Sequence, residues 1–283
     1  MKPAGPVAPT WRRIARGLWF AFSLITGTIM MNPAAAAPVF QLKPAVEYFD
    51  DPQTLALLDA ALAGDLKRAQ SLIAAGANPQ AEGPRQAVNR IDLLDYAIAA
   101  GKPQAIRVLV AVGADPERIH QGPGNAFLFA MKLEKMDLYA LLLDLKPVAS
   151  LSKDTLEYLM FGAVRQPCRP CLELLLKRGV PIDLPDGAGY TILLRTMDLQ
   201  DYELAEWILL QGASVKIEPP SGVTPAYSVQ YDLEKFRPGT PTHDQVLRLK
   251  ALMQGLSTQL SQGEPASRLG VTGNAVSVSR TAR

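Results

Sequence analysis

One pair of residues in this 283-residue chain has a spacing that is typical of a reactive site. Cys168 and Cys171 are its two cysteines, and they form the sequence Cys-Arg-Pro-Cys at the predicted start of a helix. In thioredoxin-like proteins, a C-x-x-C pair at a helix N-terminus has a lowered thiol pKa and exchanges disulfides. Those proteins set the pair in a strand–helix–strand context, which the surrounding sequence does not predict. The pair therefore indicates a small disulfide in an oxidising compartment or, alternatively, a thiol-disulfide redox site.

The other residues that could do chemistry do not form a catalytic or metal-binding motif. The two histidines, His120 and His243, lie in different predicted loops, and neither is next to a cysteine. The sequence contains no H-E-x-x-H motif and no G-x-S-x-G nucleophile motif. Asp50 and Asp51 fit the start of a helix better than a pair of catalytic acids. We therefore predict a protein that is not an enzyme and has no metal site and no cofactor.

The strongest pattern in the chain is a unit of two helices that repeats. Its clearest copy is Asp186–Gly212, where a turn with Gly189 precedes Thr191 and an apolar helix runs to about Leu199. A two-residue turn follows, and a second helix ends at Gly212. A glycine suits the left-handed residue that commonly comes just past a helix end. This segment therefore predicts a helix–turn–helix unit.

Two independent sets of positions recur along the chain with a period of 33 residues, apart from one first interval of 37. The first set opens each unit: Leu55, Asp92, Asn125, Tyr158, Thr191 and Thr224. The second set is the glycine that ends each unit: Gly76, Gly113, Gly179 and Gly212, with Lys146 at the position where the third unit lacks one. Agreement of the two sets predicts six units in one register.

This layout resembles the ankyrin repeat, a 33-residue unit of a turn and two helices with the signature T-P-L-H-x-A. Residues 222–225 read Gly-Val-Thr-Pro, which matches the family's G-x-T-P, and residues 76–78 read Gly-Ala-Asn, similar to its G-A-[DN]. The resemblance implies an all-α solenoid of about six helix-turn-helix units with short β-hairpin turns. We assign residues 52–260 to it, with a lead-in at residues 37–51 and a disordered tail at residues 261–283.

The first 36 residues differ from the rest and are typical of an export signal. Three arginines between residues 12 and 16 precede an uncharged, mostly apolar run at residues 18–31, and Ala34–Ala37 follow. This order predicts a secretory signal peptide at residues 1–36 that is cleaved before Ala37. A run of 14 residues is shorter than the roughly 20 that span a bilayer. We expect a periplasmic protein without a membrane segment after cleavage, and an uncleaved inner-membrane anchor is the alternative.

Loss of the predicted signal changes the charge of the chain. The whole sequence has 29 basic and 27 acidic side chains, and residues 1–36 contain Lys2 and the three arginines but no acid. The remaining body is therefore slightly acidic and has no basic footprint for nucleic acid. We expect a monomer that binds a protein partner and does not bind nucleic acid.

The resemblance also implies a binding surface. In ankyrin proteins, partners bind a concave face lined by the first helices, together with the hairpin tips. The position seven residues after each unit start faces that surface, and we call the four residues there the concave ladder: Lys132, Arg165, Asp198 and Tyr231. The hairpin tips are implied at Asn89, Gln121, Asp154, Ala188 and Tyr190. The alternative is an ordinary solvated face. The client could be an enzyme that the protein supports or a toxin that it neutralises.

Overall fold

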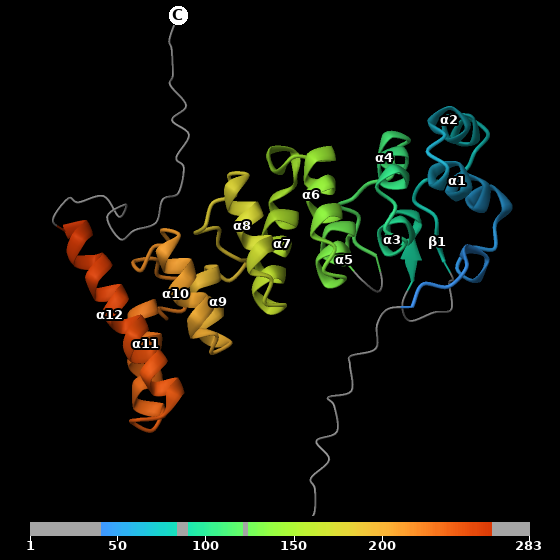
Figure 1. The fold of residues 1–283 in the computed structure, drawn as a ribbon. Coiled ribbons are helices and arrows are strands. Elements are labelled where there is room, and N and C mark those ends of the chain that lie inside the picture. The colour runs from blue at the N-terminus through green and yellow to red at the C-terminus, as the bar shows by residue number, and fades with distance from the viewer. Residues whose placement is uncertain (1–40, 84–89, 121–123, 262–283) are drawn as a thin grey trace, which may run out of the picture. The chain divides into compact units, whose positions relative to one another are not determined.

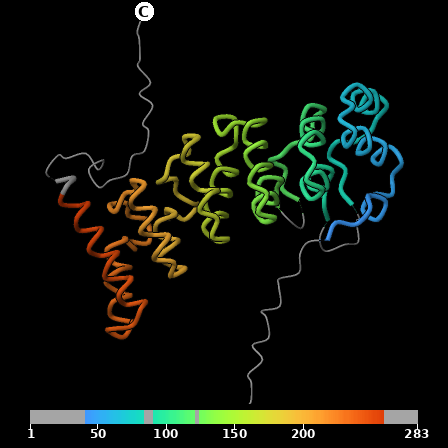
Figure 2. Tube along the Cα trace, viewed as in Figure 1, coloured from blue at the N-terminus to red at the C-terminus, as the bar shows by residue number. Residues whose placement is uncertain are grey.

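Six pairs of helices follow one another along the described part of the chain in the computed structural model (Figure 1). The structure describes residues 41–83, 90–120 and 124–261, all within one compact unit. The trace in Figure 2 passes from one pair to the next in chain order. The predicted signal peptide, two of the predicted hairpin-tip residues (Asn89 and Gln121) and the tail after residue 261 lie outside the described residues.

Each pair consists of a first and a second helix. The first helices are α1 (Pro52–Leu62), α3 (Leu93–Ala99), α5 (Ala126–Lys132), α7 (Lys153–Arg165), α9 (Ile192–Asp198) and α11 (Pro225–Lys235). The second helices are α2 (Leu66–Ala74), α4 (Pro103–Ala111), α6 (Met136–Leu145), α8 (Arg169–Lys177), α10 (Tyr202–Leu210) and α12 (Pro241–Ser261). Short 3-10 helices form η1 (Ala45–Glu47) and η2 (Val148–Ser150). The predicted all-α class with about six helix pairs is confirmed.

Stacking of like helices joins the pairs. From α3 to α11 each first helix contacts the next first helix, and α2, α4, α6 and α8 form a second contacting series. The buried side chains make one continuous core that runs from Phe49 to Leu256. Each unit thus covers its apolar faces with its neighbours, as expected for a repeat protein. Within the described residues, no helix combines the length and hydrophobicity needed to cross a bilayer.

Strands are few in the described residues. β1 (Glu82–Gly83) and β2 (Ile91–Asp92) pair in antiparallel register, with Glu82 opposite Asp92. The sequence predicted such hairpins before the helix pairs. Before α9, the corresponding turn is closed instead by a hydrogen bond from Asp186 N to Tyr190 O, at 2.8 Å.

Side chains at the helix starts explain where the first helices begin. Asp92, Asn125 and Thr224 each accept a hydrogen bond from the backbone N–H three residues later. Such a cap satisfies a donor that has no partner within the helix. Asp51 caps α1 in the same way, with Pro52 at the first helical position, which confirms the prediction that this aspartate starts a helix.

The fourth unit begins earlier than predicted. The repeat register places its start at Tyr158, but α7 begins at Lys153 and is capped by Ser152. A serine hydroxyl can accept the capping hydrogen bond, whereas a tyrosine side chain is too long to do so. Asp154, predicted at a hairpin tip, therefore lies in the first turn of a helix. Capping by Asp51 similarly moves the start of α1 ahead of the predicted Leu55.

The glycines that end the units adopt the left-handed backbone that the sequence predicted. The φ angles lie between +92° and +101° for Gly76, Gly113, Gly179 and Gly212. Lys146, which replaces the glycine in the third unit, has a φ of −131°. Its ammonium group lies 2.7 Å from the carboxylates of both Asp115 and Glu117, so an ion-pair network holds the end of α6.

We expect Gly179→Ala to lower the free energy of unfolding by about 1–2 kcal/mol, because an L side chain in left-handed backbone crowds its own carbonyl. Nothing lies within 4 Å of an added Cβ at Gly179, so backbone strain alone would cause the loss. Gly187→Ala is the matched control, since Gly187 is equally open and has no positive φ. Urea unfolding measures both variants, and equal stabilities would contradict the assigned strain.

Candidate partner-binding groove

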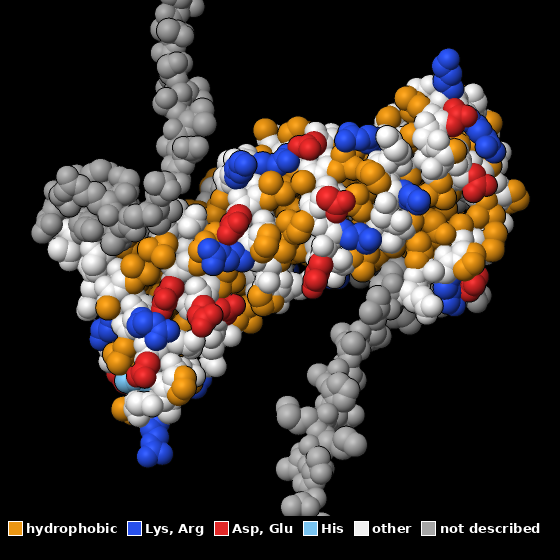
Figure 3. Space-filling view, viewed as in Figure 1, with side chains coloured by type: hydrophobic (Ala, Val, Ile, Leu, Met, Phe, Trp, Pro, Cys, Tyr) orange, Lys and Arg blue, Asp and Glu red, His pale blue; other side chains and the backbone are white. Residues whose placement is uncertain are grey.

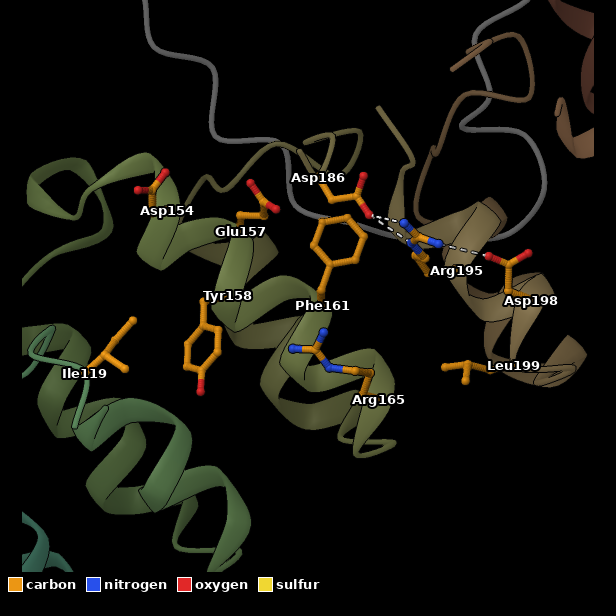
Figure 4. Close-up of a pocket in the computed structure, with 10 residues that line it drawn as sticks. All are labelled: Ile119, Asp154, Glu157, Tyr158, Phe161, Arg165, Asp186, Arg195, Asp198 and Leu199. Atoms are coloured by element: carbon orange, nitrogen blue, oxygen red, sulfur yellow. Dashed lines mark hydrogen bonds and ion pairs between the residues drawn. The ribbon is translucent and has the colours of Figure 1, made fainter. Parts of the chain in front are cut away.

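A groove of about 600 Å³ lies along α7 and α9 (Figure 4). We call it the α7–α9 groove. Its lining comes from α7, from α9 with the residue after it, from the turn before α9 and from the loop before α5. The lining residues are Ile119, Asp154, Glu157, Tyr158, Phe161, Arg165, Asp186, Arg195, Asp198 and Leu199.

The apolar part of the groove comes from three elements. Tyr158 and Phe161 are three residues apart on α7 and therefore share one face of that helix. Phe161 is buried and forms the floor. Ile119 and Leu199 stand on opposite sides of it in Figure 4, and their side chains are 63% and 53% exposed. Large apolar side chains exposed on either side of an aromatic floor are available to contact a partner.

Arg195 organises the α9 side of the groove. Its Nε lies 2.8 Å from Asp186 Oδ2, and its Nη1 lies 3.2 Å from Asp198 Oδ2. The guanidinium also stacks 4.2 Å from the centre of the Tyr190 ring. Burial alone would raise the pKa of Asp186, but hydrogen bonds from Arg195 and from two backbone N–H groups lower it. Arg195 is thus neutralised and holds the turn against α9.

Two charged side chains of α7 are left for a partner. Glu157 accepts a hydrogen bond from Gly187 N at 3.0 Å, whereas neither Asp154 nor Arg165 interacts with another residue of the groove (Figure 4). Asp154 lies in the first turn of α7 and Arg165 in its last turn. They are 11 residues apart, which is about 16 Å along a helix. The groove therefore presents an anion at one end and a cation at the other.

Comparison with known proteins identifies the fold. No protein-family model matches the sequence, and no curated protein matches it. The ankyrin repeat domain of Bcl-3, a member of the IκB protein family, is 20% identical; the alignment covers 75% of this chain and 87% of that one, with a TM-score of 0.50. The chain has the ankyrin-repeat fold. At 20% identity, the similarity to the Bcl-3 domain establishes the fold of this chain and does not identify its partner.

Two further ankyrin-repeat structures are similar. The ankyrin repeat protein EF0377 is 20% identical, with 70% of this chain and 97% of that one covered and a TM-score of 0.45. An ankyrin repeat domain from Acinetobacter baumannii is 17% identical, with 69% and 97% covered and a TM-score of 0.43.

The ankyrin-repeat fold places the four residues of the concave ladder on the surface: Lys132, Arg165, Asp198 and Tyr231. Arg165 and Asp198 come together in the α7–α9 groove, and Asp154 joins them. Lys132 instead lines a different cavity beside Cys168. Tyr231 stacks on Tyr227 of α11, with ring centroids 6.4 Å apart. The binding roles of these residues stay predictions.

The predicted hairpin-tip residues before α9 differ in exposure. Ala188 is exposed in the turn, and its N–H donates to Asp186 Oδ1 at 2.9 Å. Tyr190 is half-buried because its ring packs against Arg195 and its hydroxyl lies 2.8 Å from Ser221 Oγ. Tyr190 is therefore a support of the groove wall rather than a freely exposed tip.

Four apolar residues of the groove were not among the predicted binding residues: Ile119, Tyr158, Phe161 and Leu199. Tyr158 was assigned to the start of a helix, so its partnership with Phe161 on one helical face was not visible. Leu199 directly follows the ladder residue Asp198 and could have been found as its neighbour. Ile119 lies in a loop of another unit, and no spacing rule connects it to α7.

The two cysteines are joined by a disulfide in the structure, with their Cα atoms 5.3 Å apart. Cys171 is buried, and Cys168 is half-buried at the residue that precedes α8. Cys168 Sγ lies 4.0 Å from Met136 Sδ, and Cys171 Sγ lies 3.5 Å from the same sulfur atom. Cys168 also lines the cavity of about 550 Å³ that contains Lys132. The bridge therefore ties the start of α8 to its own first turn and packs on α6.

Proposed function

We propose that this chain is a non-catalytic interaction module that holds a segment of a partner protein in the α7–α9 groove. The observation that carries the proposal is the exposed apolar pair Ile119 and Leu199, which line the same groove as the charged side chains of Asp154 and Arg165. Contacts with large apolar side chains supply binding energy, and charges at the rim of an interface select the partner and its orientation. The ankyrin-repeat fold supports a binding role, since it offers an extended surface.

The groove defines the chemistry of the partner segment. An apolar side chain in its middle would cover Phe161 and lie between Ile119 and Leu199. A basic side chain would meet Asp154, and an acidic one would meet Arg165 about 16 Å away. Figure 3 shows acidic and basic side chains interspersed on the visible face. Pairing of individual charges, rather than one field of a single sign, would therefore set specificity.

The test is affinity capture from a periplasmic extract, with the mature chain and its groove variants compared in parallel. One protein retained by the parent chain should be lost with Asp154→Lys and with Arg165→Glu. Each change would place the new side chain opposite a partner side chain of the same charge. Retention of the same proteins by the parent and by both charge-reversal variants would refute the groove as the site. Under this proposal the client is an enzyme that the module supports or a toxin that it neutralises.

We also propose that the chain is exported and acts in the periplasm. Two observations support this location: the order of residues 1–36 and the disulfide between Cys168 and Cys171, since disulfides persist in oxidising compartments.

The exported protein should begin near Ala37 and appear in the soluble periplasmic fraction, because its 14-residue apolar run is followed by a small-residue cleavage site. N-terminal sequencing of the protein from fractionated cells provides the measurement. Recovery of residues 1–30 in the membrane fraction would instead establish the inner-membrane anchor.

A thiol-disulfide redox factor is the second candidate function. The half-buried position of Cys168, at the start of α8 and at a cavity, favours it. A Cys168→Ser, Cys171→Ser double variant separates the two functions. Under the binding proposal this variant retains the parent's partners, whereas a redox factor would lose them.

A further inference from the structure

A second polar site is buried where the second and third units meet, and none of its three side chains lines the α7–α9 groove. Asp92 and Asp95 stand at the start of α3, and His120 lies in the loop that leads to α5. The exposed fractions of their side chains are 4%, 0% and 1%, respectively. One oxygen or nitrogen atom from each side chain lies within 4.8 Å of the other two.

The start of α3 orients the two carboxylates. Asp92 Oδ1 accepts a hydrogen bond from Asp95 N at 2.8 Å, and Asp95 Oδ2 accepts one from Asp92 N at 3.3 Å. This reciprocal cap leaves Asp92 Oδ2 and Asp95 Oδ1 outside the pair of capping bonds. Backbone hydrogen bonds to carboxylates are the type of support that holds metal ligands in place.

His120 directs its ring at these carboxylates. Its Nε2 lies 3.0 Å from Asp95 Oδ2 and 3.5 Å from Asp92 Oδ2. His120 Nε2 is thus within ion-pair distance of both carboxylates, whereas His120 Nδ1 and Asp95 Oδ1 have no hydrogen-bond partner. Buried polar atoms without partners are uncommon in proteins. Together with the short distances from His120 Nε2 to the two carboxylates, these unpartnered atoms indicate a ligand at this cluster.

Nearby arginines are engaged by another acid. Arg118 Nη2 lies 2.5 Å from Glu82 Oε1, and Arg90 Nη1 lies 3.7 Å from Glu82 Oε2. Arg118 also donates to the carbonyl oxygen of Gln80. Glu82 stands opposite Asp92 in the strand pair, so these arginines are held at the hairpin beside the site.

We propose that Asp92, Asp95 and His120 bind a divalent transition-metal cation of the zinc class. In a tetrahedral site with bonds of about 2.0–2.1 Å, ligand atoms are about 3.3 Å apart. The separations of 3.0 Å and 3.5 Å from His120 Nε2 lie on either side of that value. One imidazole and two carboxylates are suitable ligands for zinc, and three protein ligands leave one position open.

This site contrasts with the sequence prediction of no metal. That prediction relied on ligands that are close in sequence, whereas His120 lies 25 residues after Asp95. Binding of the cation would link the start of α3 to the loop before α5 and thereby join two units. A purely structural polar cluster, which holds the units together without a cation, is the competing outcome of the test.

The test is titration of the full chain, treated with chelator and then dialysed, with Zn²⁺ alone under non-reducing conditions. Calorimetry should give one bound ion per chain, and the thermal midpoint should rise with Zn²⁺ concentration, because the ligand binds the folded state. Co²⁺ substituted for Zn²⁺ should give the visible absorption of a tetrahedral site. Absence of stoichiometric binding of both ions would overturn the proposal.

Two ligand variants assign the ion to the site. His120→Ala should weaken Zn²⁺ binding by more than ten-fold, whereas His243→Ala is the matched control and should leave it unchanged. Asp92→Asn provides a second arm if His120→Ala does not fold, since asparagine keeps a capping oxygen and loses the negative charge. Unchanged Zn²⁺ affinity in the folded ligand variants would refute the assignment.

Discussion

Replacing Ile119 and Leu199 together by serine should reduce partner capture by about 100-fold. Each truncated contact residue should cost about 1–2 kcal/mol of binding free energy, and each loss of about 1.4 kcal/mol weakens binding ten-fold. The fold should survive, because both side chains are more than half exposed. Capture of the partner from periplasmic extract, quantified by mass spectrometry, measures the loss, and circular dichroism checks the fold. Leu247→Ser is the matched control, as Leu247 is 44% exposed on α12 and lies outside the groove.

Single variants of the concave ladder refine this expectation. Arg165→Ala should weaken capture by about ten-fold. Tyr231→Ala should have a smaller effect, because Tyr231 packs on Tyr227 and does not line the groove. Parent-like capture by both the serine double variant and Arg165→Ala would exclude the α7–α9 groove. The segment at residues 238–243, which comprises the end of the α11–α12 loop and the start of α12, would then be the next surface to test.

Glu117→Gln should remove much of the acid sensitivity that the parent chain shows between about pH 4.5 and pH 2. Glu117 Oε1 lies 2.7 Å from Lys146 Nζ. Its Oε2 accepts hydrogen bonds from Ser152 N at 2.9 Å and Ser152 Oγ at 2.7 Å. The carboxylate thus joins the segment after α4 to the end of α6 and the start of α7.

The sign of the pH effect follows from the pKa of Glu117. Burial would raise this pKa, but hydrogen bonds from Lys146, Thr155 and Ser152 lower it from 4.5 to about 2. Below about pH 4.5 the unfolded chain therefore takes up the proton before the folded chain does. The stabilisation is fully present above that pH and is lost as the pH falls toward 2. It amounts to up to about 3 kcal/mol.

Urea unfolding at pH 7, 5, 4 and 3 measures this effect. At pH 7 the Glu117→Gln variant should be less stable than the parent, and the difference should shrink as the pH falls, because other carboxyl groups titrate equally in both chains. Glu47→Gln is the control, since Glu47 is half exposed and pairs only with Lys43 among the described side chains. A difference from the parent that stays constant from pH 7 to pH 3 would contradict the assigned pKa.

Local signals in the sequence were enough to predict the helix pairs and their order. Backbone sterics alone favour glycine where a helix ends at a positive φ, so Gly76, Gly113, Gly179 and Gly212 marked four of the unit ends before any contact was known. Capping is equally local, since the side chain of Asp92 or Asn125 bonds a backbone group three residues away. These short-range requirements recur every 33 residues and therefore define the repeat.

The start of α7, the groove and the cluster around His120 could be recognised only from the way the units stack. Ser152 rather than Tyr158 begins the fourth pair because its hydroxyl can both cap α7 and donate to Glu117 of the preceding unit. Stacking also sets Ile119 of one unit beside the α7 face of the next, and it brings His120 over the start of α3. A repeat period predicts which residues occupy equivalent positions within a unit. Contacts between non-equivalent side chains of neighbouring units depend on the packing of helices and loops, and only the tertiary structure decides them.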